Sequence, residues 1–182
     1  MSLIEKTAIF SYEELLQIGS AVHSAKIKKG NLHEDYVAEH LEKKGDVVKR
    51  KVIIALSDRP ESYSQPTYEL DIWAENTDEI KLIDPKGPSW NNNTPMSDTL
   101  MKYLLAKKEV EKNTQKRVRF ILLKNMEEGY DYERHKKKAA PYGIEILRSN
   151  KFLSDLSNEE INVDQYLAQK THNLIKENLQ KI

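Results

Sequence analysis

The sequence predicts a mixed α/β domain whose central sheet is covered by helices on both faces. Segments of β-like composition are clustered in the first half of the chain, and further on they alternate with segments of helical periodicity. The 182 residues correspond to one domain with a modest extension, at about 150 residues per domain. Strands that first follow one another and then alternate with helices indicate such a mixed α/β domain.

The chain is expected to have three parts. Residues 1–30 are predicted to form an N-terminal helical extension, residues 31–150 the core, and residues 151–182 a C-terminal helical extension. The first helix is predicted to end before Gly30, and a second to end near Gly45 after a basic last turn.

The core is expected to contain a hairpin, because two β-like runs are separated by the polar segment 75–79. A helix is predicted from Thr94 and Pro95, as N-cap and first helical residue, to about Lys112. The remaining core elements alternate, and the C-terminal extension is predicted to be helical from Ser154 onward. The predicted strands are Val47–Leu56, Tyr68–Ala74, Ile80–Asp84, Val118–Leu123 and Ile144–Leu147, with a polar helix at Asp131–Ala140.

The composition excludes several classes of protein. Cysteine is absent, which excludes disulfide frameworks, thiolate metal sites and thiol nucleophiles, so any metal must bind oxygen or imidazole. The longest apolar run, Val52–Leu56, has five residues, far fewer than the ~20 of a membrane span. The first ten residues include an acid and a base and contain no apolar h-region, so we expect a cytoplasmic protein without a secretory signal. Lys plus Arg and Asp plus Glu both number 29, so phosphate binding would depend on local clusters.

The predicted hairpin contains the most informative residues. A turn centred on Thr77 and Asp78 places Asp71 opposite Asp84. Because side chains alternate along a strand, Glu69, Asp71, Asp84 and Lys86 are expected to share one face. Two facing carboxylates repel each other and need a cation. Mg²⁺, for which Mn²⁺ can substitute, would bind one or two such carboxylates together with waters and phosphate oxygens.

Glu34 is a candidate third acid. It precedes Ala38 by four residues and Leu41 by seven, so it lies on the apolar stripe of its helix and should point inward. An inward carboxylate is costly unless it is paired. Glu34 could therefore complete a metal site or form hydrogen bonds with the metal ligands.

These residues resemble the PD-(D/E)XK nuclease superfamily, which includes most type II restriction endonucleases. The similarity consists of Asp71, twelve intervening residues, Asp84-Pro85-Lys86, and the preceding helix with Glu34. It covers roughly residues 31–147 in element order and four specific positions. It implies a restriction-endonuclease-like sheet flanked by helices on both faces, with residues 31–150 as the nuclease core. It further implies Mg²⁺ ligands at Asp71, Asp84 and Glu34, and a catalytic lysine at Lys86.

The sequence differs from the family pattern at two positions. Leu70 replaces a frequent proline, which is a common variation. Pro85 replaces an apolar strand residue, and proline cannot donate to a ladder, so Asp84 and Lys86 should lie near a strand end or edge. The alternative interpretation of the hairpin is an ordinary solvated ion-pair face. The apolar residues predicted on both of its faces argue against that alternative.

Candidate DNA-binding residues follow the motif and recur on a later helix. Trp90 could stack on a base, and Asn91, Asn92 and Asn93 could contact adenine edges, although asparagines also favour turns. The later basic cluster could bind phosphates, or it could be only a solvated helix face. Its candidates are Arg134, Lys136, Lys137 and Lys138.

Together these patterns predict a Mg²⁺-dependent endonuclease that hydrolyses phosphodiester bonds of double-stranded DNA. A sequence-specific type II restriction enzyme acting as a homodimer fits the resemblance, since palindromic sites match two-fold symmetry. One alternative is a structure-selective nuclease of repair, recombination or transposition with the same fold. Another is a catalytically inactive DNA-binding module.

Overall fold

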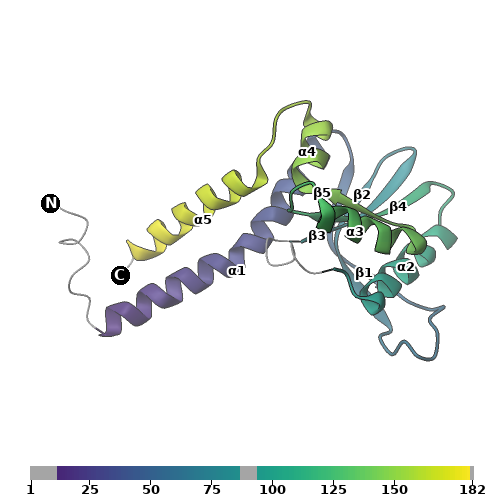
Figure 1. Cartoon of the computed structure of the whole chain (residues 1–182), viewed down its shortest axis with the longest axis horizontal. Helices are drawn as coiled ribbons and strands as arrows, with labels where there is room; N and C mark the ends of the chain where they lie inside the picture. The colour runs from purple at the N-terminus through teal and green to yellow at the C-terminus, as the bar shows by residue number, and fades with distance from the viewer. Residues whose placement is uncertain (1–11, 87–93, 181–182) are drawn as a thin grey trace. The chain divides into compact units, whose positions relative to one another are not determined.

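The structure is a computed structural model that describes residues 12–86 and 94–180. One compact unit, His33–Val163, contains the whole described sheet (Figure 1). The other described residues, the first part of helix α1 and most of helix α5, belong to a second unit. The residues predicted to carry catalysis all lie within the unit His33–Val163.

The elements alternate much as the sequence predicts. The strands are β1 Val47–Ala55, β2 Thr67–Glu75, β3 Glu79–Lys86, β4 Arg117–Lys124 and β5 Ile144–Arg148. The helices are α1 Tyr12–Lys43, α2 Ser97–Lys112, α3 Tyr130–Ala139, α4 Ser149–Ser157 and α5 Val163–Leu179. The predicted strand ends differ from these by at most two residues. Among the described residues, no helix combines the length and apolar character needed to cross a membrane.

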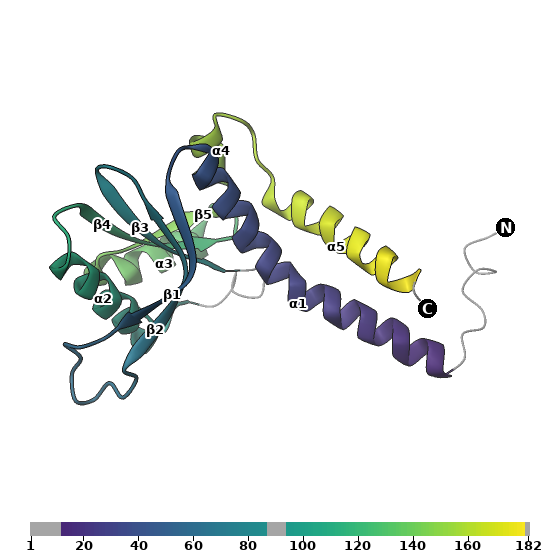
Figure 2. The same cartoon turned by 180° about the vertical axis from the view of Figure 1, so that it is seen from behind.

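The five strands form one mixed sheet in the order β1-β2-β3-β4-β5. The pairs β1/β2 and β2/β3 are antiparallel, whereas β3/β4 and β4/β5 are parallel. Parallel neighbours need a crossover connection, which α2 provides between β3 and β4 and α3 between β4 and β5. This architecture confirms the predicted α/β fold class with a mixed central sheet (Figure 2).

Helices cover both faces of the sheet. On one face, Leu100 and Tyr103 of α2 pack with Leu82, Phe120 and Leu122 in the main core. Strand alternation directs the intervening residues of β3 and β4, including the fully buried Ile83 and Ile121, to the other face. There, α4 contacts both β4 and β5. The end of α1 supplies the buried Val37 and Leu41 outside the main core.

Two of the predicted helix boundaries are wrong: the end of the first helix before Gly30, and the start of the later helix at Thr94 and Pro95. Helix α1 continues through Gly30, because an interior glycine costs a helix about 1 kcal/mol without ending it. Helix α2 begins at Ser97 with Met96 at the N-cap, and the predicted cap at Thr94 lies before it. Leu100 N–H donates to the Met96 carbonyl, which fixes the first turn two residues later than predicted.

The predicted helix from Ser154 onward is two helices. Helix α4 ends at Ser157, and Asn158 follows it in the left-handed conformation with φ 58°. Asparagine tolerates this conformation better than most residues, so it ends the helix as a glycine would. Helix α5 then begins at Val163, whose N–H is bound by the Asn150 side chain.

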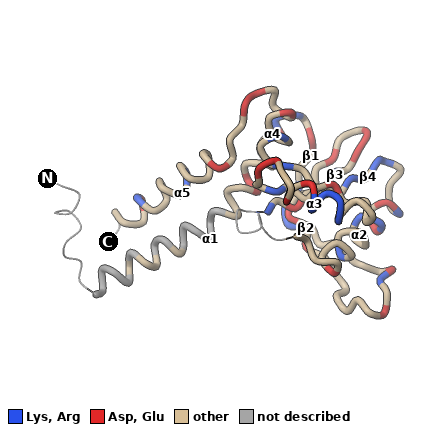
Figure 3. Tube along the Cα trace, viewed as in Figure 1, with Lys and Arg blue, Asp and Glu red and all other residues tan. Residues whose placement is uncertain are grey.

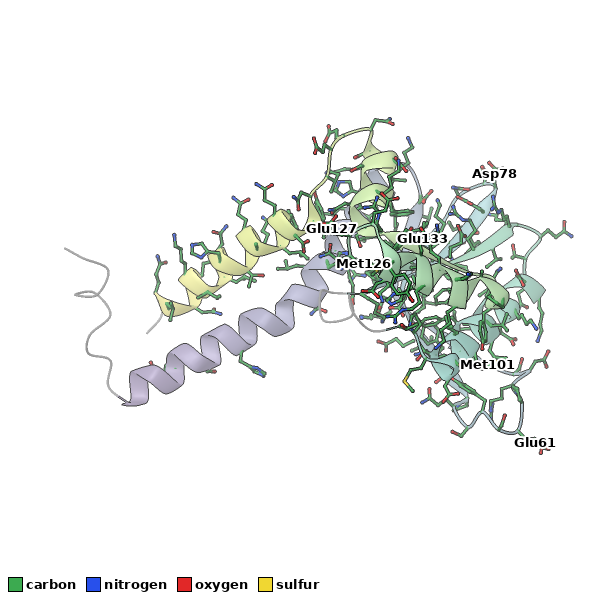
Figure 4. All side chains as sticks on the ribbon, viewed as in Figure 1. Glu61, Asp78, Met101, Met126, Glu127 and Glu133 are labelled. Carbon is green, nitrogen blue, oxygen red and sulfur yellow. The ribbon has the colours of Figure 1, made fainter. Side chains whose placement is uncertain are left out.

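The β2/β3 hairpin has the predicted register. Ile72 pairs with Ile83 and Trp73 with Leu82, so the same register places Asp71 opposite Asp84. The turn is stabilised by Asn76, whose side-chain oxygen accepts the N–H groups of Asp78 and Glu79, each at 3.0 Å. Asp78 marks the exposed tip (Figure 4).

Strict side-chain alternation does not hold along the whole of β2. Alternation predicts that Tyr68 and Trp73 lie on opposite faces, yet Tyr68 belongs to the main core and Trp73 packs against the same core. The irregularity coincides with Lys51, which has φ 54° and lies between the pairs Arg50↔Ile72 and Val52↔Leu70. The register is the same on both sides of this point, so no residue is inserted. The distortion lets Tyr68 share the core with Phe120, at a ring-centroid distance of 6.1 Å.

Candidate functional site

Asp84 is a buried carboxylate near the end of β3, with 2% of its surface exposed. Its Oδ2 accepts hydrogen bonds from Tyr103 Oη at 2.7 Å and from Tyr68 Oη at 3.2 Å. Its Oδ1 accepts one from Lys86 Nζ at 2.6 Å. Both carboxylate oxygens are therefore held in place, and one of them is held by the predicted catalytic lysine.

Pro85 explains why this carboxylate lies where β2 and β3 diverge. The pairing between β2 and β3 ends at Ile72 and Ile83, whereas β3 remains paired with β4 as far as Lys86. Proline has no N–H to donate, so a position with only one bonded neighbour suits it. Lys86 is the last residue of β3 in the described part of the chain.

Asp71 is the second acid of the site, and its side chain is 18% exposed. Burial, a hydrogen bond with Asp84 and the negative charge of Asp84 together raise the pKa of Asp71 to about 7. Burial alone would raise the pKa of Asp84, but the Asp71 hydrogen bond and the Lys86 ammonium hold it below its ordinary range. The two facing carboxyls thus share one proton near neutral pH, as expected for like charges brought together.

Glu34 reaches the site through two cations of β1. Its Oε2 lies 2.8 Å from Arg50 Nη2 and 3.2 Å from Lys51 Nζ. Lys51 Nζ also lies 3.0 Å from Asp71 Oδ1. Arg50 additionally binds Asp35 of α1 at 2.5 Å. Glu34 is therefore paired with Arg50 and Lys51 and not with the predicted metal ligands, and Lys51 connects it to Asp71.

The acids do not converge into a three-ligand group. In the described part of the chain, no cluster of three or more histidine, cysteine or acidic side chains is arranged to hold a metal ion. Asp71 and Asp84 are brought together, and Lys86 joins them. Glu34 is held instead on the far side of Lys51. The arrangement thus offers two facing carboxylates as oxygen ligands, the donor type and number that Mg²⁺ commonly takes from a protein.

Four further residues belong to the site although the sequence did not assign them to it. Lys51 was recognisable only as part of a basic run, and Tyr68 and Tyr103 only as residues of a strand and of an apolar helix face. Lys102 of α2 places Nζ 5.0 Å from the ring centre of Tyr68 and 5.1 Å from that of Tyr103. Burial beside Asp84 raises the pKa of both tyrosines, so their hydroxyls stay protonated and donate.

Two more cations lie along the same end of the sheet. Strand register aligns Lys86 with Lys124 of β4, and Lys124 with Arg148 of β5. Lys124 is fully buried, and its Nζ lies 2.8 Å from His135 Nδ1 of α3. Burial lowers the pKa of Lys124 to about 8 and that of His135 to about 4. The imidazole is therefore neutral near pH 7 and can accept a hydrogen bond from the lysine.

The predicted DNA-binding residues fall into two groups. Trp90, Asn91, Asn92 and Asn93 lie outside the described residues. Arg134, Lys136, Lys137 and Lys138 are exposed on α3, with His135 between them facing inward. Two of the four form ion pairs within the helix, Arg134 with Asp131 at 3.1 Å and Lys136 with Glu133 at 3.4 Å. Basic and acidic residues are interspersed over the larger unit (Figure 3). Figure 4 labels Glu133, the partner of Lys136.

Comparison with known proteins finds several similar solved structures, two of which are described here. No family model matches the chain, and no similar curated protein was found. A protein of unknown function, AF1548, shares 16% identity with a TM-score of 0.47, over 81% of this chain and 93% of that one. The small subunit of the heterodimeric restriction endonuclease R.BspD6I shares 14% identity with a TM-score of 0.41, over 89% and 96%. Both TM-scores lie below 0.5, so neither similarity supports a conclusion about fold or activity.

Proposed function

We propose that the protein is a Mg²⁺-dependent endonuclease that hydrolyses phosphodiester bonds in double-stranded DNA. The observation that carries the proposal is the juxtaposition of Asp71 and Asp84 on adjacent strands, with Lys86 Nζ 2.6 Å from Asp84. A solvated ion-pair face would pair each acid with a base at low cost. Here two acids share a proton in a largely buried setting, which a structural role does not require.

Asp71 and Asp84 are the proposed ligands of the ion. A bound Mg²⁺ would polarise the phosphate and lower the pKa of a bound water. Tyr68 and Tyr103 fix the Asp84 carboxylate, so that its position changes little when the proton on Asp71 is lost. Glu34 is proposed as the outer acid, which either reaches the ion or orients its surroundings through Lys51.

Lys86 is the proposed catalytic lysine. Its ammonium lies at the end of β3 with a side chain that is 22% exposed, so it can reach a substrate without leaving the sheet. A fixed positive charge at this position would orient the attacking water and stabilise the negative charge that develops on the transferring phosphorus. Arg134, Lys136, Lys137 and Lys138 are proposed phosphate contacts, and Trp90 and Asn91–Asn93 are proposed base contacts.

A sequence-specific restriction enzyme acting as a homodimer is the proposed biological form. The experiment is incubation of the purified protein with plasmid and phage DNA in Mg²⁺ or Mn²⁺, beside the variant Asp84→Asn. We expect cleavage by the wild type and a loss of at least about 100-fold in the variant, because one ligand and the partner of Lys86 are altered together.

Glu75→Gln is the matched control, because Glu75 lies on β2 like Asp71 but pairs with Lys116 at the hairpin end of the strand. It should cleave at the wild-type rate. Discrete bands would support sequence specificity, and a smear or branch-dependent cutting would favour the structure-selective nuclease. DNA retention without any cleavage in either metal would contradict the proposal and favour an inactive DNA-binding module.

A further inference from the structure

Lys51 occupies an unusual position in the sheet. It is one of two described residues other than glycine with positive φ, and it interrupts the β1/β2 ladder opposite Asp71. A left-handed conformation is unfavourable for a lysine and persists when surrounding contacts hold it. The contacts available to it here are ionic, because its ammonium lies between two carboxylates from different elements.

The Lys51 ammonium lies where a cation would be expected to bind. Its Nζ is 3.0 Å from Asp71 Oδ1 and 3.2 Å from Glu34 Oε2, so one positive charge bridges both acids. A divalent ion bound through Asp71 would compete for the same carboxylate. Lys51 thus supplies, within the chain itself, part of the charge neutralisation that an added ion would supply.

Lys51 and Lys86 differ in how firmly they are held. The Lys51 side chain is 46% exposed and its acceptors are 12% and 18% exposed, so its ammonium can move into solvent. Lys86 binds Asp84, whose side chain is 3% exposed and is also bound by two tyrosines. Of these two cations, Lys51 is therefore the one that an incoming ion can displace.

We propose that Lys51 is an intrinsic competitor for the metal ion, which holds Asp71 until a divalent cation displaces its ammonium. This inference rests on the proposed function, because it assigns a regulatory role at the same site. It makes Lys51 a positioning residue that sets the metal concentration at which the site fills. The bridge to Glu34 gives the displaced ammonium a second acceptor, which keeps Lys51 near the site after Asp71 is released.

The test is calorimetric titration of Mn²⁺ into the whole protein without DNA, so that catalysis does not enter the measurement. Lys51→Met should bind Mn²⁺ about tenfold more tightly than wild type, because the ion no longer has to displace a charge from Asp71. Lys51→Asn should show the same gain in Mn²⁺ affinity as Lys51→Met. Asparagine also tolerates the positive φ at this position. Thermal unfolding in EDTA verifies that each variant is folded.

Arg50→Met is the matched control for charge alone. Arg50 neighbours Lys51 and binds Glu34 and Asp35, but Asp71 is bound by Lys51. The affinity of Arg50→Met for Mn²⁺ should stay within about threefold of wild type, because only the charge more distant from Asp71 is lost. Asp84→Asn should abolish binding, which assigns the measured heat to this site.

The possible failures of the two proposals can be distinguished. If wild type binds Mn²⁺ and the Lys51 variants bind it no more tightly, or no more tightly than Arg50→Met, then Lys51 is not a competitor and the nuclease proposal is unaffected. If wild type and both Lys51 variants bind no Mn²⁺, the metal-dependent function itself is contradicted. Tighter Mn²⁺ binding by the Lys51 variants, but not by Arg50→Met, supports both proposals.

Discussion

The two ends of β3 carry buried ions in contrasting arrangements. Near its start, Lys81 lies 2.7 Å from Asp46 and 3.2 Å from Glu79, and Asn76 donates to the remaining oxygen of Asp46. Near its end, Asp84 faces another acid and depends on a lysine and two tyrosine hydroxyls. The first cluster places a cation among acids, whereas the second brings two acids together.

This difference separates a structural ion pair from a candidate reactive site. The charges at Lys81 are complementary, so this buried pair needs no additional ion. The pair Asp71 and Asp84 retains a proton that a cation could replace, because like charges this close cannot both ionise easily. Burial alone therefore does not identify function, but the sign of the neighbouring charge does.

The largest contrast is expected between the two lysines of β3. Lys86→Ala should reduce DNA cleavage by at least about 100-fold, because it removes the charge that we propose faces the reacting phosphate. Mn²⁺ binding should persist in this variant, since both aspartates remain. The measurement is single-turnover cleavage beside calorimetry. Wild-type cleavage by Lys86→Ala would remove Lys86 from the mechanism.

Lys81→Ala should have the opposite effect. The substitution leaves Asp46, with a side chain only 4% exposed, without its buried cation, which should cost about 3 kcal/mol of unfolding free energy in urea titrations. Cleavage below the unfolding transition should match wild type. The double variant Lys81→Met with Asp46→Leu should recover part of the stability, because it removes both charges together. A cleavage defect in folded Lys81→Ala would contradict the purely structural role assigned to Lys81.

The pH dependence of stability should report the shared proton. The pKa of Asp71 is about 7 when folded and about 3.9 when unfolded, so the folded state binds the additional proton between these values. Stability contributed by Asp71 should therefore fall as pH rises from about 4 to 7, on the order of 2 kcal/mol. The difference between wild type and Asp71→Asn, measured by urea unfolding in EDTA, isolates this contribution. A difference that is constant with pH would show that Asp71 has an ordinary pKa.

The smallest expected effect concerns the hydroxyls that hold Asp84. Tyr103→Phe should lower the unfolding free energy by about 1 to 2 kcal/mol, because a buried carboxylate loses its 2.7 Å donor. Tyr68→Phe should cost less, since its hydrogen bond is longer at 3.2 Å. Both variants should also raise the pKa of Asp84, which pH titration by NMR can follow. Equal losses would indicate that the two hydroxyls share the role.

The hairpin and its acids were predictable because their determinants are local. A short polar turn fixes the register, and register alone brings Asp71 opposite Asp84. The strand end at Lys86 was predictable from Pro85 for the same reason, since the missing N–H is a property of one residue. The order of elements then gave the fold class.

The rest of the site depends on contacts between distant segments. Tyr103 reaches Asp84 from a helix 19 residues further along the chain. Tyr68 donates to Asp84 from a strand in which side-chain alternation is not regular. Lys51 adopts a backbone conformation that the sequence does not predict for a lysine. Glu34 was predictable as an inward acid, but its partners Arg50 and Lys51 lie on another element, β1, which the pattern of the helix does not identify.

The position of β1 in the sheet gives its basic run another consequence. In the described sheet β1 is an edge strand with one neighbour, and a long regular edge can pair with the edge of another molecule and start aggregation. Lys49, Arg50 and Lys51 place charge along this edge, and the turn of the backbone at Lys51 breaks its regularity. The same lysine that contacts Asp71 therefore also interrupts the edge to which a strand of another molecule could pair.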